Sequence, residues 1–283
     1  MVSDLVRQGK NDLRRAQWAW LRRSGRRFAL TRGTESYLVR VGEDAISRSL
    51  FIYGEFDFYT VELARQILDR PQGFRKIADI GANIGPIAIA ALSRGLAETV
   101  LAVEPERANM EFLKINASLN NVSDQFIFVE AAVGDGHLSA VDLSINAINF
   151  GDHRIVPSND SRQSVVNVST VTLDDICSDF DASLDLIVMD IQGYEGHALR
   201  GAADTLHRCI PIIMEIFPEG LMEHGTTGAD LVDLLHDYNR WYDLRALNPE
   251  PREIHEIADL FNSLAPSFGT DANSPRDADI LLV

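Results

Sequence analysis

Ile77-Ala78-Asp79-Ile80-Gly81-Ala82-Asn83-Ile84-Gly85-Pro86 is the stretch that decides the fold, and an apolar run, 87–92, follows it. An apolar run that ends in an acid, then a glycine turn and a segment of helical length, predicts a strand, a tight loop and a helix. Pro86 fits the first turn of that helix, where a missing backbone N–H costs nothing. The positive end of the helix dipole would point at the loop, so the loop suits a bound ligand.

A second apolar run, 100–103, ends in Glu104 and Pro105. An acid at this place accepts hydrogen bonds from the ribose hydroxyls of a nucleotide-type cofactor. Dinucleotide sites have G-x-G-x-x-G, whereas this loop reads D-x-G-x-N-x-G. Asp79 would disfavour a pyrophosphate but favour a sulfonium and an amino group. The sequence therefore predicts an S-adenosylmethionine (S-adenosyl-L-methionine) site rather than a merely capped turn. Its residues would be Asp79, Gly81, Asn83, Gly85, Glu104 and Pro105.

Composition narrows the class of protein. The chain has 283 residues, 46% of them hydrophobic and 24% charged, which suits one large domain with an appendage. Its formal charge of −16 argues against a nucleic-acid partner, because phosphate neutralisation needs a basic surface. Two cysteines are too few for a disulfide framework, and no apolar run is long enough for a signal peptide or a membrane span. We expect a cytoplasmic protein that is soluble or peripheral to the inner membrane face.

The first 57 residues form a predicted extension. Residues 1–35 carry a net charge of +6, and the rest of the chain carries −22. The pattern over 3–27 predicts a basic amphipathic helix, which either packs on its own domain or a partner subunit of a homo-oligomer, or lies on a membrane surface. Residues 37–41 and 46–52 predict a β-hairpin. The apolar positions of the helix are Leu5, Val6, Leu13, Ala16, Trp20 and Leu21.

Residues 58–283 alternate between strand and helix patterns after a first helix at 58–68. This alternation predicts an α/β fold with a doubly wound, mostly parallel sheet. A β-rich insertion at about 138–173 interrupts it and is a natural element for substrate selection. Strands are expected at 75–80, 98–103, 125–130, 185–190, 210–216 and 279–283, and helices at 86–94, 107–118, 195–207 and 227–238.

Acids end several of these strands. The carboxyl ends of parallel strands line one crevice, so Asp79, Glu104 and Asp190 should converge there. Asp190 would therefore border the cofactor too, and Glu130 and Ala131 would border its adenine. Glu215, which lies near the end of another strand, is equally readable as a helix cap.

A hydroxyl acceptor benefits from a base that takes its proton as the new bond forms. Asp190 and Glu195 are the best-placed catalytic candidates, and His153 in the insertion is a third. Asp190 and Glu195 would also make half of a divalent-metal site. No other ligand pair of convincing spacing follows, so a metal is not expected.

Taken together, these motifs resemble the FkbM family of S-adenosylmethionine-dependent methyltransferases over about residues 76–217. The resemblance implies a class I methyltransferase (Rossmann-like) fold with a seven-stranded sheet, and O-methylation of hydroxyls on sugars, polysaccharides or natural products. The segments that carry it are D-I-G-A-N-I-G at 79–85, V-E-P at 103–105, A-A-V-G-D at 131–135, V-T-L-D-D at 171–175, D-I-Q-G-Y-E-G at 190–196 and L-R-G-A at 199–202.

One residue departs from the family pattern. Where the family has D-x-E-G-x-E, this chain has Gln192, which keeps an acceptor oxygen but loses the charge. Two other functions stay open on the sequence alone: a nicotinamide-dependent oxidoreductase, and a non-catalytic module that binds S-adenosylmethionine. Residues 1–57 and 138–170 lie outside the clear resemblance and are where the choice of acceptor is expected to be made.

Overall fold

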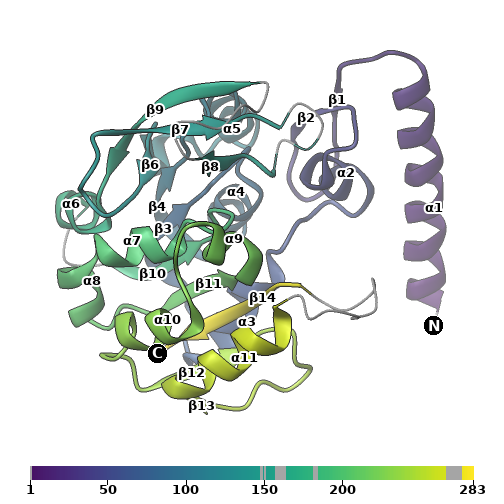
Figure 1. Cartoon of the computed structure of the whole chain (residues 1–283). Helices are drawn as coiled ribbons and strands as arrows, with labels where there is room; N and C mark the ends of the chain where they lie inside the picture. Colours follow the sequence, from purple (N-terminus) through teal and green to yellow (C-terminus); the bar gives the residue numbers. More distant parts are fainter. Residues whose placement is uncertain (1, 147–148, 150, 157–163, 181–183, 266–275) are drawn as a thin grey trace.

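A computed structural model describes residues 2–146, 149, 151–156, 164–180, 184–265 and 276–283. Its centre is an eight-stranded sheet in the order β5-β4-β3-β10-β11-β14-β12-β13 (Figure 1). The five strands from β5 to β11 are parallel, and β14 runs antiparallel between β11 and β12. The bounds are β3 Phe74–Ile80, β4 Ala97–Val103, β5 Phe126–Val129, β10 Leu184–Met189, β11 Ile212–Ile216, β12 Arg240–Asp243, β13 Arg252–Glu253 and β14 Ala278–Leu282.

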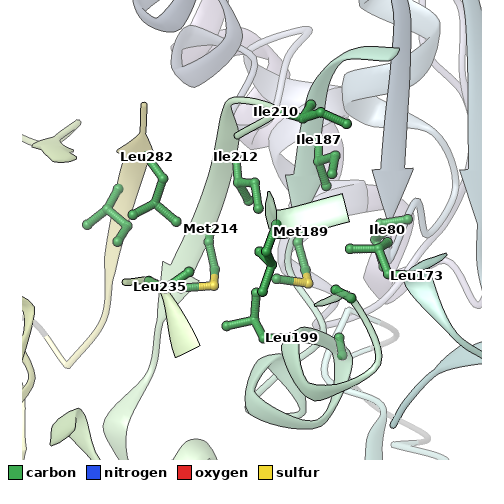
Figure 2. Close-up of a cluster of buried hydrophobic side chains, with 14 of the residues drawn as sticks. Ile80, Leu173, Ile187, Met189, Leu199, Ile210, Ile212, Met214, Leu235 and Leu282 are labelled. Carbon is green, nitrogen blue, oxygen red and sulfur yellow. The ribbon is translucent and has the colours of Figure 1, made fainter. Parts of the chain in front are cut away.

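Helices cover both faces of this sheet, which confirms the doubly wound fold. Successive strand residues point to opposite faces, so Ile77 and Val188 belong to one apolar cluster while Ile80 and Met189 belong to the other. Figure 2 shows the second cluster, between strands β3, β10, β11 and β14 and helices α6, α7 and α10. The helices after the extension are α3 Tyr59–Ile67, α4 Pro86–Ser93, α5 Arg107–Leu119, α6 Leu173–Asp179, α7 Glu195–Arg200, α8 Ala203–His207, α9 Pro218–Glu223, α10 Gly228–Leu234 and α11 Ile257–Leu264.

The sheet differs from the expectation in small elements. It has eight strands rather than seven, because the two-residue strand β13 pairs with β12 at its edge. The helix expected over 195–207 is broken at Gly201, where a Cβ would collide with the carbonyl oxygen of Gly134. No helix among the described residues combines the length and the apolar character that crossing a membrane requires.

The expected hairpin over 37–41 and 46–52 is wrong. Ala45–Ile52 is the helix α2, and its N-cap is Asp44, whose Oδ2 accepts from the backbone N–H of Ser47 at 2.9 Å. The hairpin lies earlier and joins β1 (Phe28–Leu30) to β2 (Leu38–Arg40). A strong side-chain cap outweighs the β-rich composition of 46–52 here.

Helix α1 (Val2–Arg23) is present, but its buried face is not the expected one. Trp18 and Leu21 are buried, whereas Leu13, Ala16 and Trp20 are exposed. The ring of Trp18 lies 5.2 Å from that of Phe51, centroid to centroid. The extension thus packs through Trp18 and Leu21 into the cluster that also contains α4. Whether the chain divides into domains at residue 57 stays a prediction.

The insertion forms a second sheet in the order β6-β9-β7-β8 beside the main one (Figure 1). Its strands are β6 (Ala132–Val133), β7 (Ala140–Ser144), β8 (Arg154–Val156) and β9 (Val165–Val171). The polar loop around Asn159, expected between the β-rich runs, lies outside the described residues. In the described part of 138–173, β7 pairs antiparallel with both β8 and β9.

Candidate active site

Three cavities meet at the carboxyl ends of β3, β4, β10 and β11. The first, of about 550 Å³, is lined by Gly81, Asn83, Glu104, Pro105, Ala131, His153 and Asp190 among others. The second, of about 520 Å³, lies against Asp79, and the third and largest, of about 1210 Å³, lies against the insertion and Glu215. Asp190 lines all three. The strand-end acids Asp79, Glu104 and Asp190 therefore do converge, as expected.

Glu104 follows β4 and is held by the loop that the sequence singles out. Its Oε2 accepts from the backbone N–H of Asn83 at 2.9 Å, and its Oε1 accepts from that of Glu106 at 3.0 Å. Asn83 lies in this loop in a left-handed conformation, with a φ of +49°. Burial raises the pKa of Glu104 to about 7 despite these donors. The loop thus fixes the Glu104 carboxylate at the wall of the first cavity.

Asp79, near the end of β3, is 3% exposed and lines the second cavity rather than the first. Burial raises its pKa to about 7, and the charges of Asp190 and Glu104 act in the same direction. Its Oδ2 has no hydrogen-bond partner among the described residues. A buried carboxylate oxygen without a donor is a place where a cationic or hydrogen-bond-donating ligand group is stabilised.

The two loop glycines serve the packing of the protein itself. Gly81 has a φ of +88° and lines the first cavity, and a Cβ there would collide with the carbonyl oxygen of Asp190. At Gly85, the φ is +87° and a Cβ would collide with the side chain of Leu113. Gly85 lines none of the three cavities. The fold therefore requires glycine at both positions, whether or not these residues also allow a ligand to come close to the backbone.

The two carboxylates that the sequence offers as bases occupy different environments. Asp190 faces the cavities, and its Oδ1 accepts from Nε2 of Gln192 at 2.8 Å. Glu195 is fully buried beneath the turn, where its Oε1 accepts from the backbone N–H groups of Ile191 and Gly193 at 3.0 and 3.2 Å. Glu195 lines none of the three cavities. Asp190 alone of this pair is placed to touch an acceptor.

His153, on the insertion, lines the first cavity. Burial lowers its pKa, so the ring is neutral at physiological pH. The backbone N–H of Asn146 donates to its Nδ1 at 3.0 Å, and the proton of the neutral ring is therefore on Nε2. This tautomer offers a hydrogen-bond donor at Nε2 rather than a base. Glu130 is exposed and lines none of the three cavities, while its neighbour Ala131 lines the first.

Sequence reasoning missed much of the acidic wall of the largest cavity. Its lining includes Glu215 from β11, which the sequence left open as a cap, together with Asp57, Asp152, Asp277 and Asp279. Burial raises the pKa of Asp57 to about 6 and that of Asp279 to about 7. No local motif marks these residues, because they come from separate elements that only the tertiary fold brings together.

Two arginines on the same wall are already paired. Nε of Arg154 lies 2.7 Å from Oδ1 of Asp152, and Nη2 of Arg245 lies 2.7 Å from Oδ2 of Asp243. These acids neutralise the two cations that a phosphate or carboxylate would otherwise use. The largest cavity is therefore unfavourable for an anionic ligand.

Several solved structures are similar to this chain, all at low identity. A methyltransferase FkbM from Methylobacillus flagellatus has 18% identity and a TM-score of 0.46, and the match covers 81% of this chain and 48% of that one. A tRNA m1G37 methyltransferase of M. jannaschii has 12% identity and a TM-score of 0.39, with 91% and 54% covered. The chain thus spans about half the length of these two proteins. No curated protein matches it in sequence.

A family model described as the methyltransferase FkbM domain matches residues 79–242. The match covers more than half of the chain and includes the loop after β3, Glu104, the insertion, Asp190 and Glu215. The chain belongs to the FkbM methyltransferase family.

Proposed function

We propose that the chain transfers a methyl group from S-adenosylmethionine to a hydroxyl group on a sugar, a polysaccharide or a natural product. The place of Asp190 carries this proposal, because this residue lines all three cavities. A cofactor in the first two cavities and an acceptor in the largest would meet at its carboxylate. Membership of the FkbM family supports the reaction class.

The residues of the first two cavities fit the cofactor. Glu104 would accept hydrogen bonds from the ribose hydroxyls, and Ala131 leaves room for the adenine ring. The buried, unpartnered Oδ2 of Asp79 would face the amino group of the methionine part. When bound, the cofactor supplies an electrophilic methyl group. The sulfonium sulfur that carries this methyl group becomes a neutral thioether when the methyl group is transferred.

Asp190 would receive the proton of the acceptor hydroxyl. Its side chain is exposed to the cavities, but the surrounding protein desolvates the carboxyl group and raises its pKa above that of an ordinary aspartate, which brings its basicity closer to neutral pH. The hydrogen bond from Gln192 to Oδ1 orients the carboxylate. Gln192 therefore takes a positioning role that needs no charge of its own.

The acceptor is proposed to be neutral and hydroxylated. The acidic wall and the paired arginines of the largest cavity disfavour phosphates, so a nucleic acid is not the expected substrate. Side chains from the insertion, such as Asn149 and Arg154, line this cavity together with Ile46 and Asp57 of the extension region. These two segments are the proposed determinants of acceptor choice.

Calorimetry with S-adenosylmethionine tests the cofactor part of the proposal. We expect saturable binding by the full chain and none of NAD. Glu104→Gln removes the charge that strengthens the ribose hydrogen bonds, each worth about 1.5–3 kcal/mol, so its affinity should fall at least tenfold.

The matched control for this measurement is Glu111→Gln, an exposed position on α5 that loses the same charge and should bind as the wild type does. Equal affinities of both variants would remove Glu104 from the cofactor site. If the chain bound NAD and not S-adenosylmethionine, the proposed methyl transfer would be wrong and a nicotinamide-dependent reaction would be favoured. A screen of glycans with a labelled methyl donor then tests the acceptor.

A further inference from the structure

Three carboxylates from two neighbouring strand ends converge at the floor of the acceptor side. Asp190 follows β10, Glu195 begins α7, and Glu215 lies in β11, which pairs with β10. One oxygen of each lies within 4.8 Å of the others. Around Mg²⁺ or Ca²⁺, ligand oxygens lie about 3–5 Å apart, so the cluster has the size of a cation site.

Two of these carboxylates keep an oxygen that nothing in the described chain satisfies. Glu195 is fully buried, and its Oε2 has no hydrogen-bond partner among the described residues. Oε2 of Glu215 is likewise buried and has no hydrogen-bond partner among the described residues. Native proteins rarely leave such groups unpaired, because each one costs the free energy of desolvation. The two orphaned oxygens therefore point to a missing positive ligand.

The charges around the cluster point the same way. Two further acids, Asp277 and Asp279, line the largest cavity together with Asp190 and Glu215. No arginine, lysine or histidine pairs with any of the three carboxylates in the part of the chain that the structure describes. A cation between these carboxylates would offset their mutual repulsion.

We propose that Asp190, Glu195 and Glu215 together bind one divalent cation of the oxygen-liganded class, such as Mg²⁺ or Mn²⁺. An ammonium group of an acceptor fits less well, because it would enter through the largest cavity and Glu195 does not line that cavity. A small ion between the three side chains reaches all of them. The sequence offered only Asp190 and Glu195 as ligands, since Glu215 joins them solely through the pairing of β10 with β11.

The cation would act at the acceptor end of the site, and this consequence rests on the proposed function. Three carboxylate ligands leave coordination positions open, and two of the ligands, Asp190 and Glu215, line the largest cavity. Those positions suit two adjacent oxygens of a polyhydroxylated acceptor. The acceptor class is thereby narrowed to compounds with vicinal oxygens, such as the diols of sugars.

Titration of the EDTA-treated full chain with Mn²⁺ tests the site, with free Mn²⁺ followed by electron paramagnetic resonance. We expect one saturable site per chain at pH 8, and weaker binding at pH 6, because protons compete for the same oxygens. Glu215→Gln and Asp190→Asn should each weaken binding at least tenfold. Glu219→Gln, an exposed position on α9 with the same loss of charge, should leave it unchanged.

Several outcomes would overturn the proposal. One is the absence of saturable Mn²⁺ binding up to millimolar concentration, and another is an unchanged affinity in both Glu215→Gln and Asp190→Asn. Thermal stabilisation by a simple diamine but not by Mn²⁺ would assign the acids to an amine instead. Binding of S-adenosylmethionine to the metal-free chain is measured separately, so failure of the cation site and failure of the proposed function give different results.

Discussion

Gly81 shows how one residue joins the loop of the site to the fold. Its φ of +88° disfavours any side chain, and a Cβ would meet the carbonyl oxygen of Asp190 and lie 3.2 Å from the side chain of Ile191. We expect Gly81→Ala to lower the free energy of unfolding by more than about 3 kcal/mol, since both strain and collision act. Urea unfolding followed by circular dichroism measures it.

Gly95 gives the matched comparison, because its φ is +68° and no atom of the described residues lies within 4 Å of a Cβ built there. Gly95→Ala carries the strain without the collision, so it should cost only about 1 kcal/mol. If both substitutions cost the same, contact with Asp190 contributes nothing and the backbone conformation alone explains the glycine.

At this scale the sequence predicts which acids end strands, but not what surrounds them. Asp79, Glu104 and Asp190 each follow an apolar run, and this pattern is enough to bring them to one edge. The burial of Glu195 depends on the turn before it, where Gln192 and Gly193 both have positive φ. Such a turn is set by packing, including the close approach of Gly193 to the backbone of Gly220. Periodicity carries no signal for it.

For helix α1, the sequence predicts the helix but not the face that packs on the rest of the protein. Its amphipathic, basic character is evident from the sequence, yet the face that packs contains Arg14, Trp18 and Leu21 rather than Trp20. Arg14 lies on this face because its Nη2 donates to the carbonyl oxygen of Arg32 at 2.7 Å. A pattern that counts only apolar residues assigns an arginine to the solvent side and so rotates the predicted face.

Two tryptophan substitutions test how α1 is held. Trp18 is 3% exposed and contacts Phe51. Trp18→Ala should therefore weaken the packing of α1 on the rest of the protein by about 3–5 kcal/mol and expose the arginine-rich helix to trypsin. Trp20 is 59% exposed and lies beside Arg26, so Trp20→Ala should change stability by less than about 0.5 kcal/mol. Urea unfolding and the rate of tryptic cleavage at α1 measure both effects. A larger effect from Trp20→Ala would mean that α1 packs through its other face.

For the whole molecule, the sequence predicts the topology better than the electrostatics. The parallel strands and the helices between them follow from alternating patterns, and the position of β14 between β11 and β12 completes the sheet. The formal charge of −16 is also plain from composition, but its concentration at one edge of the sheet is not. The acids that gather there come from residues as far apart as Asp57 and Asp279, and only the closed fold brings them together.

That gathering of acids predicts an unusual dependence of stability on pH. Burial raises the pKa of Asp57 to about 6, and it raises those of the other acids above their ordinary values as well. A carboxyl group whose pKa is higher in the folded state binds more protons there, so its stabilising effect is full below the unfolded pKa and is lost as pH rises to about 7. The other acids are Asp79, Glu104, Asp190, Glu195, Glu215 and Asp279.

Two histidines oppose this trend. Burial lowers the pKa of His224 to about 4 and also lowers that of His153. Their contribution to the free energy of unfolding therefore falls as pH drops below about 6.5. Because there are seven such carboxyl groups and only two such imidazoles, the carboxyl groups should determine the sign of the change in the free energy of unfolding between pH 5 and pH 8. Below about pH 4 the trend should reverse, because Arg245 holds the pKa of Asp243 below its usual range.

We therefore expect the free energy of unfolding to be higher at pH 5 than at pH 8, by at least about 3 kcal/mol, since one unit of pKa difference in one group is worth about 1.4 kcal/mol. Urea unfolding of the metal-free chain at both pH values, in the same salt concentration, measures the difference. Addition of Mn²⁺ at pH 8 should recover part of the loss, because a cation at Asp190, Glu195 and Glu215 neutralises the charges that repel one another there. A stability that is flat or rises from pH 5 to pH 8 would show that these carboxyls keep ordinary pKa values in the folded protein.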